Sequence, residues 1–136
     1  MSQENVEIAR RVVAAWNSDN LEGFLAELDP EIEWHAALEQ ALEGAGSTYR
    51  GHEGVRRAWD VYRSEAFGGL TVHVHEFRDL GESVLCLGRM DATGRTTGIE
   101  VGGELGLLFS FRNGKLARSR DFLSHAEALE AVGLRE

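Results

Sequence analysis

The chain has 136 residues, one cysteine and a formal net charge of −9 at pH 7. This acidic balance argues against binding to nucleic acids or to anionic membrane surfaces, because both recruit clustered lysine and arginine. Hydrophobic residues make up 43% of the sequence, enough for a single globular domain over residues 1–136, and no apolar run has the length of a membrane span. With a polar amino-terminal sequence that lacks a signal-peptide core, we expect a cytoplasmic protein.

Three helices are predicted in the first half of the chain. The first ends near Trp16, and a shorter second helix from Leu21 stops at Asp29-Pro30, since the residue before proline avoids helical backbone angles. The third helix follows the turn at residues 49–54 and ends at Gly68-Gly69. The stretch from Ala36 to Arg50 has no clear period and is predicted to be a functional loop or lid, with a short helix possible at Leu38–Leu42.

Five strands are predicted, and four of them follow one another in the second half of the chain. The first covers residues 31–35, and the others cover roughly residues 70–77, 84–92, 99–111 and 116–123. Asn113-Gly114 predicts a tight hairpin between the last two strands. Ser124 with Glu127 forms a capping pattern for a short closing helix. Helices segregated before consecutive strands indicate an α+β fold with a curved antiparallel sheet.

Three charged residues on neighbouring strands form the main candidate site. Side chains two apart in a strand share a face, so Arg89 and Asp91 point the same way as Leu87. In the last strand, Asp121 has the opposite parity to Arg118 and Arg120 and can point inward while they point out. Two acids and an arginine in apolar surroundings could form a catalytic site or, alternatively, a structural network of ion pairs.

The chain resembles a known family in its order of elements and in several short motifs. These motifs are Trp16, Asp29-Pro30, Trp34, Tyr49-Arg-Gly51 and the segment from Arg112-Asn-Gly-Lys to Leu134. Together they resemble the SnoaL-like branch of the NTF2-like superfamily. The resemblance implies a cone in which a curved antiparallel sheet wraps on three helices, with a ligand cavity inside and a homodimer formed through the outer face. This fold hosts cyclases, isomerases, dehydratases, hydrolases and non-enzymatic binders, so it does not decide the chemistry.

A narrower part of the sequence is similar to limonene epoxide hydrolases. Arg89-Met-Asp91, together with Asp121, resembles their Asp-Arg-Asp arrangement, which implies that Asp121 is the base, Asp91 the acid and Arg89 the bridge. The chain departs from that family at two positions, because Trp34 and Ala36 stand where the hydrolases hold water with a tyrosine and an asparagine.

Further residues are candidates for the wall of a substrate pocket. The aromatic ones belong either to the core or to an apolar cavity, and Glu104 is either a pocket acid or an exposed strand end. His35 points outward if Trp34 points inward. The candidate pocket residues are Trp16, Trp34, His35, Tyr49, Trp59, Tyr62, Leu87, Glu104 and Phe109.

No metal or cofactor is expected. His73 and His75 share a face but lack a third residue at metal-ligand spacing, and the glycines show no phosphate-loop or dinucleotide pattern. The cavity that the resemblance implies predicts an apolar small molecule as the partner, besides a second copy of the chain. The homodimer is also indicated by Gly106–Phe111, a strand segment that is apolar on both faces.

Two functions from different classes remain open. The first is a small pocket enzyme that uses acid-base chemistry, either epoxide hydrolysis or a polyketide-type cyclisation or isomerisation. In an isomerase, Asp121 would shuttle a proton and Arg89 or Tyr49 would donate a hydrogen bond. The second is a non-catalytic ligand-binding or dimerisation module of the same fold.

Overall fold

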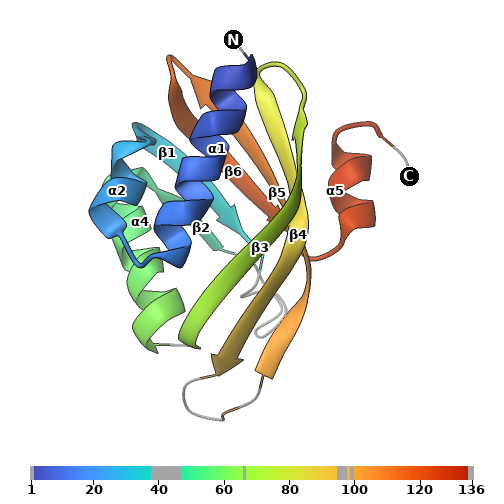
Figure 1. The fold of residues 1–136 in the computed structure, drawn as a ribbon. Helices are drawn as coiled ribbons and strands as arrows, with labels where there is room; N and C mark the ends of the chain where they lie inside the picture. The colour runs from blue at the N-terminus through green and yellow to red at the C-terminus, as the bar shows by residue number, and fades with distance from the viewer. Residues whose placement is uncertain (1, 38–46, 66, 95–97, 99, 135–136) are drawn as a thin grey trace.

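The computed structural model describes residues 2–37, 47–65, 67–94, 98 and 100–134, and shows a curved six-stranded sheet with helices on both faces (Figure 1). Helices α1, α2 and α4 lie on one face, and α5 lies on the other. The elements in chain order are α1 (Ser2–Asn17), α2 (Leu21–Ala26), β1 (Leu28–Ala36), β2 (Ser47–Arg50), α4 (Gly51–Asp60), a π-helical turn η1 (Val61–Glu65), β3 (Phe67–Asp79), β4 (Ser83–Gly94), β5 (Glu100–Arg112), β6 (Lys115–Phe122) and α5 (His125–Ala131).

The sheet confirms the predicted α+β class but is not wholly antiparallel. Its strand order is β2-β1-β6-β5-β4-β3. Strands β3 to β6 pair as consecutive antiparallel neighbours, whereas β1 runs parallel to β6, with Trp34 opposite Ser119. The parallel pair arises because β1 comes from the helical half of the chain and inserts beside the last strand, with no hairpin between them.

Two predicted boundaries were wrong. Helix α2 ends at Ala26, and Asp29 and Pro30 belong to strand β1. Pairing with β6 is irregular between Leu28 and Glu33, so a proline without an N–H group is tolerated there. Gly68 and Gly69 lie within β3 and do not end the third helix, which continues as the π-helical turn.

Other local predictions were confirmed. Asn113 and Gly114 have φ angles of 54° and 76°, as a tight hairpin turn requires, and connect β5 to β6. The Ser124 hydroxyl accepts a hydrogen bond of 3.0 Å from the Glu127 N–H at the start of α5. Residues 47–50 of the predicted loop form β2, and the possible helix at Leu38–Leu42 lies outside the described residues.

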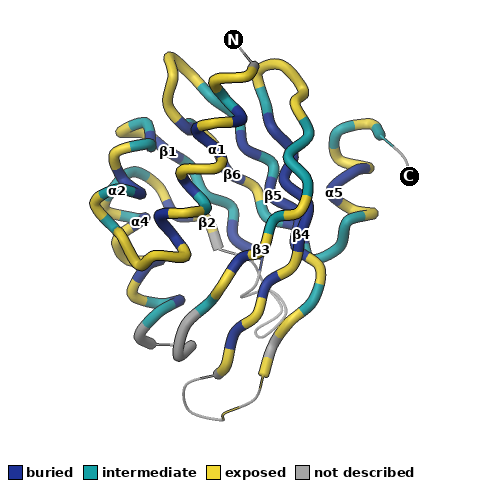
Figure 2. The backbone as a smooth tube through the Cα atoms, viewed as in Figure 1, coloured by how far each residue is buried: buried dark blue, intermediate teal, exposed yellow. Residues whose placement is uncertain are grey.

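The core has two parts, one on each face of the sheet. Figure 2 shows buried residues concentrated along the central strands, with exposed residues on the outer sides of α1, α2 and α4. The larger part lies between these helices and the inner face. The smaller part lies under α5 and consists of Leu85, Leu87, Phe122, Ala128 and Leu129.

The smaller part of the core explains why strand β5 is apolar on both faces. Leu107 and Phe109 face the helices, while Leu108 packs against the cluster under α5. A Cβ atom added to Gly106 would lie 2.6 Å from the Ala128 Cβ, so glycine at this position lets α5 approach the sheet closely. Helix α5 therefore covers part of the face assigned to a homodimer, and the dimer stays a prediction.

Candidate functional site

Strand alternation brings Asp121 to the inner face of the sheet. Arg118 and Arg120 are exposed on the outer face of β6, whereas Ser119 and Asp121 point between the sheet and the helices. Asp121 pairs with Leu107 of the neighbouring strand, which faces the same way. The predicted inward orientation of Asp121 follows from this geometry.

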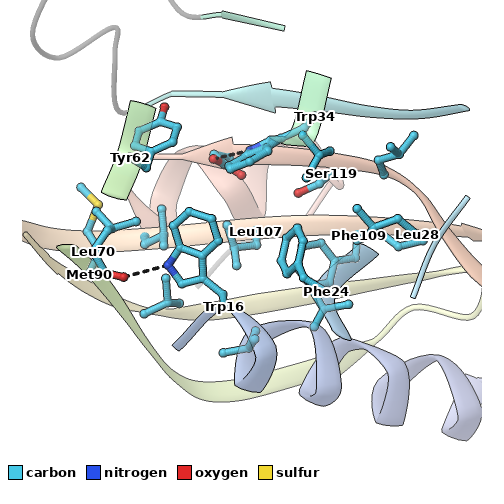
Figure 3. Close-up of a pocket in the computed structure, with 18 residues that line it drawn as sticks. Trp16, Phe24, Leu28, Trp34, Tyr62, Leu70, Met90, Leu107, Phe109 and Ser119 are labelled. Atoms are coloured by element: carbon cyan, nitrogen blue, oxygen red, sulfur yellow. Dashed lines mark hydrogen bonds between the residues drawn. The ribbon is translucent and has the colours of Figure 1, made fainter. Parts of the chain in front are cut away.

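Asp121 lines a narrow apolar cavity of about 80 Å³ (Figure 3). This volume is several times the roughly 10–15 Å³ that one water molecule needs. Asp121 is the one Asp, Glu, His, Lys or Arg side chain among the described residues of the wall. The wall consists of Val12, Val13, Trp16, Phe24, Leu28, Ile32, Trp34, Val55, Tyr62, Leu70, Val72, Met90, Leu105, Leu107, Phe109, Leu116, Ser119 and Asp121.

The Asp121 carboxyl group has one hydrogen bond and one uncompensated oxygen. The indole Nε1–H of Trp34 donates to Oδ2 at 2.9 Å, which is a dashed line in Figure 3. The other oxygen, Oδ1, is closed off from solvent and has no partner among the residues that the structure describes. Burial raises the pKa of Asp121 to about 7, and the Trp34 hydrogen bond acts in the opposite direction.

Aromatic rings fix the position of Trp34 and so of its donor. The Trp34 ring stacks on Tyr62 with centroids 5.7 Å apart and an interplanar angle of 28°. Trp16 meets Trp34 edge-on at 5.9 Å. Tyr62 itself lies in the π-helical turn, a local widening that is frequent at functional sites. The indole is thereby held in one orientation toward Asp121.

Arg89 and Asp91 do not belong to this cavity, and the predicted Asp-Arg-Asp arrangement is not formed. Both are exposed on the outer face of β4, where Leu87 packs under α5. The Asp91 carboxylate pairs with His73 at 3.3 Å, and 62% of its side chain is exposed. The error has a simple cause: alternation correctly predicted that these side chains share a face, but that face is the outer one.

Four of the predicted pocket residues, Trp16, Trp34, Tyr62 and Phe109, line the cavity, and two further aromatic candidates lie behind it. Tyr49 is buried with its ring 5.8 Å from that of Trp34. Trp59 packs behind Trp16 and donates its indole N–H to Asp19 at 3.0 Å. These two rings support the wall from outside and do not reach the cavity.

Three other predicted pocket residues lie on the outside of the sheet. Leu87 is buried under α5. The Glu104 side chain is 52% exposed and accepts the backbone N–H of His125 at 2.8 Å. His35 points away from Trp34, as the alternation predicted, and lies 3.2 Å from Glu33. It borders a second, more polar hollow of about 610 Å³ between the ends of β1 and β6 and helix α5.

Sequence reasoning missed Ser119 and most of the aliphatic wall. Ser119 shares its parity with Asp121, so the alternation used for Asp121 could have identified it. Met90 was missed because both faces of β4 are apolar and the wrong face was assigned to the pocket. Within the described part of the chain, no three His, Cys, Asp or Glu side chains gather as a metal site would require. No helix in that part is both long and apolar enough to cross a membrane.

Comparison with solved structures identifies the same fold in several proteins. An NTF2-like protein of unknown function from Burkholderia pseudomallei K96243 superposes with a TM-score of 0.77 at 24% identity, over 96% of this chain and 98% of that one. TerC, co-crystallised with polyporic acid, superposes with a TM-score of 0.77 at 23% identity, over 93% and 96% of the two chains.

A third neighbour carries another small molecule. It is a hypothetical protein with a ketosteroid isomerase-like fold from Catenulispora acidiphila DSM 44928, in complex with trimethylamine, with a TM-score of 0.72 at 16% identity. The superposition covers 94% of this chain and 93% of that one. At these identities the likeness establishes the fold alone.

Comparison at the level of sequence gives the family. The chain has no match among curated proteins. The family model of the SnoaL-like domain matches residues 9–119, which is most of the chain and includes β1 to β5 and most of β6. The match confirms the resemblance inferred from the sequence motifs, and the chain belongs to the SnoaL-like domain family.

Proposed function

We propose that the protein catalyses proton transfer at a carbon atom of a small apolar molecule, as in an isomerisation or a polyketide-type cyclisation, with Asp121 as the acid and base. The observation that carries this proposal is the position of Asp121 in a cavity whose wall is otherwise apolar or neutral, where burial raises its pKa to about 7. A general acid-base group works best when its pKa lies near the working pH, because both forms are then populated.

The chemistry needs one carboxyl group. As a carboxylate, Asp121 removes a proton from a carbon next to an electron-withdrawing group, and as a carboxylic acid it returns that proton to the same or another carbon. The apolar wall favours the neutral acid and so makes the carboxylate a stronger base than it would be in water.

Epoxide hydrolysis fits this cavity less well. Opening an epoxide uses a base for the attacking water and an acid for the ring oxygen, on opposite sides of the substrate. Of the described residues that line the cavity, only Asp121 carries a carboxyl group, and Figure 3 shows the Tyr62 hydroxyl directed away from the centre of the cavity. A single carboxyl group supports a proton shuttle and not the two-acid mechanism.

The carboxyl group can present either oxygen to a ligand. Trp34 holds Oδ2, and Oδ1 is closed off from solvent. The terminal torsion of an aspartate side chain is soft, so a small rotation brings an oxygen toward the cavity at little cost.

Hydrogen-deuterium exchange at simple ketones tests the proposal, because the assay needs only an acidic C–H bond and not the natural substrate. Cyclopentanone, cyclohexanone and 2-indanone are incubated with the protein in D₂O, and loss of the α-proton signal is followed by ¹H NMR. We expect the wild type to accelerate exchange of at least one ketone, with Asp121→Asn inactive and Asp91→Asn unchanged. Exchange that survives Asp121→Asn would contradict the assignment.

A second candidate function is non-catalytic binding of a small molecule. The hydrogen bond between Trp34 and Asp121 favours it, because a carboxyl group that only holds the wall of a binding cavity would have the same partner. The two neighbours crystallised with polyporic acid and trimethylamine also support a small-molecule occupant. Ketones that bind in the cavity without any α-proton exchange would favour this function over the enzymatic one.

A further inference from the structure

Beyond Asp121, the cavity wall carries only a few polar groups, and most of them already have a partner. The Trp16 indole N–H donates to the Leu70 carbonyl at 2.8 Å, and the Trp34 N–H donates to Asp121. Figure 3 shows the Tyr62 hydroxyl directed away from the centre of the cavity. These three donors are therefore not free to bind a ligand.

Ser119 is the exception. Ser119 is 7% exposed and lines the cavity. No hydrogen bond joins its hydroxyl to any residue in the described part of the chain. Figure 3 places it beside Trp34 on one wall, across the cavity from Trp16 and Phe24. Its oxygen is not among the unpaired polar atoms that are closed off from solvent in the described residues, so the hydroxyl is open to the cavity, where a ligand can bind it.

The spacing of Ser119 and Asp121 suggests what would satisfy both. They lie two residues apart on β6, so their Cα atoms are about 6.6 Å apart along the strand and their side chains point the same way. A ligand with two interacting atoms next to each other can place one of them roughly 3 Å from the Ser119 side chain and the other roughly 3 Å from the Asp121 side chain. A carbonyl group and the carbon beside it have this arrangement.

We infer that the Ser119 hydroxyl donates a hydrogen bond to the oxygen of a small apolar carbonyl substrate while Asp121 exchanges a proton with the carbon next to the carbonyl. The inference rests on the proposed function and names its substrate class. It also replaces Arg89 and Tyr49 as donor, since neither lines the cavity.

The proton transfer balances within the substrate and these two side chains. The Asp121 carboxylate takes the proton, the C–H electron pair becomes the C=C bond of an enolate, and the carbonyl π pair moves onto the oxygen. Ser119 donates to that oxygen, where negative charge develops. The Asp121 carboxylic acid then returns the proton to the same carbon or to another carbon of the conjugated system, and the carbonyl group re-forms.

A matched pair of probes separates the hydrogen bond from simple packing. Cyclopentanone carries the acceptor oxygen, and methylenecyclopentane has the same ring with a CH₂ group in its place. Binding of each is followed by quenching of tryptophan fluorescence, to which Trp16 and Trp34 on the cavity wall respond. The variants are Ser119→Ala, Ser119→Thr, which keeps the hydroxyl, and the control Ser110→Ala, whose serine pairs with Ser83 at 3.2 Å away from the cavity.

We expect Ser119→Ala to weaken cyclopentanone binding about 3- to 10-fold and to leave methylenecyclopentane binding unchanged. The rate of α-proton exchange at saturating ketone should fall further, by about 10²- to 10³-fold, because the donor acts most strongly on the enolate oxygen. Ser119→Thr should recover both, and Ser110→Ala should change neither.

Cyclopentanone that binds the wild type no more tightly than methylenecyclopentane would overturn the inference, as would equal weakening of both probes by Ser119→Ala. Exchange lost in Asp121→Asn but unchanged in Ser119→Ala would also overturn it and leave the proposed function standing. Selective, Ser119-dependent binding of cyclopentanone with no exchange by the wild type would retain the carbonyl site and reject the proposed proton transfer.

Discussion

The inner and outer faces of the sheet hold the same type of side chain in opposite conditions. Asp121 on the inner face of β6 has its Oδ1 closed off from solvent and a single indole donor. Asp91 on the outer face of β4 is mostly exposed and lies 3.3 Å from His73, itself 60% exposed. One carboxyl group has an oxygen that solvent does not reach, although the residue as a whole is half-buried, whereas the other carboxyl group is mostly exposed.

This difference makes Asp121, and not Asp91, the candidate for acid-base chemistry. Burial without a cationic partner favours the neutral acid, so the pKa of Asp121 moves to about 7. An exposed pair such as Asp91 with His73 is screened by water and salt and contributes little to stability or reactivity. A carboxylate in a sequence motif is therefore only a candidate until its face of the sheet is known.

The largest expected effect separates the two aspartates by activity. Asp121→Asn removes the group proposed to move the proton while keeping its size, so the α-proton exchange rate of the ketones should fall about 10²- to 10⁴-fold. Asp91→Asn removes an exposed carboxylate outside the cavity and should leave the rate unchanged. Equal losses in both variants, measured by NMR at one ketone concentration, would remove the distinction between the faces.

The second prediction concerns stability and pH. The pKa of Asp121 is higher in the folded protein than its ordinary value of 3.8, so the folded state binds more protons between these two values. Its contribution is complete below the unfolded-state pKa and is lost as pH rises through about 7, at up to about 1.4 kcal/mol per pH unit.

Urea unfolding of wild type and Asp121→Asn at pH 5 and pH 8 measures this contribution. The free energy of unfolding of the wild type, relative to the variant, should fall by about 2–3 kcal/mol between the two pH values. Subtracting the variant cancels the histidines, which titrate in the same range. A difference that is constant with pH would show that Asp121 is not buried as a neutral acid.

Removing the indole N–H of Trp34 should raise the pKa of Asp121, which is a smaller effect than the two above. The Trp34 hydrogen bond lowers the pKa of Asp121 against the effect of burial. Trp34→Phe keeps an aromatic ring but loses the N–H, so the pKa should rise above that of the wild type in a ¹³C NMR titration of the carboxyl group. Hydrogen bonds to charged groups contribute roughly 1.5–3 kcal/mol, which bounds the change. A lower pKa in the variant would mean that solvent has entered the cavity.

The sequence predicted well which side chains of a strand share a face. It predicted less well whether that face is the inner or the outer face of the sheet. Alternation correctly placed Arg89 and Asp91 on one face and separated Asp121 from Arg118 and Arg120. For β6 the inner face was identifiable, since two arginines mark the outside. For β4 it was not, because the inner core covers Cys86 and Met90 while α5 covers Leu85 and Leu87. A strand buried on both faces gives no periodic signal of which side holds a cavity.

For the aromatic residues, the sequence predicted burial but not which of them reach the cavity. Trp16 and Trp59 lie in contact with ring centroids 4.7 Å apart, yet only Trp16 reaches the cavity. Helices α1 and α4, which carry Trp16 and Trp59, each show an apolar stripe. Such a stripe identifies the buried face of a helix but not which of its buried residues border a cavity. The partner of the Trp59 indole, Asp19, is 40 residues away in the sequence, and no local pattern connects the two.

The smallest predicted effect concerns the outer face itself. In an isolated chain, Asp91→Asn removes an exposed contact with His73, which is an ion pair only when the imidazole is protonated. At a pH where it is protonated, the free energy of unfolding should change by less than about 1 kcal/mol, with the difference disappearing at high salt. A homodimer that covers this face would desolvate the pair and make the loss larger and dependent on protein concentration. Urea unfolding of wild type and variant at two protein concentrations therefore tests whether this face is free. A large, concentration-dependent loss would mean that the contrast between the two aspartates holds only for the single chain.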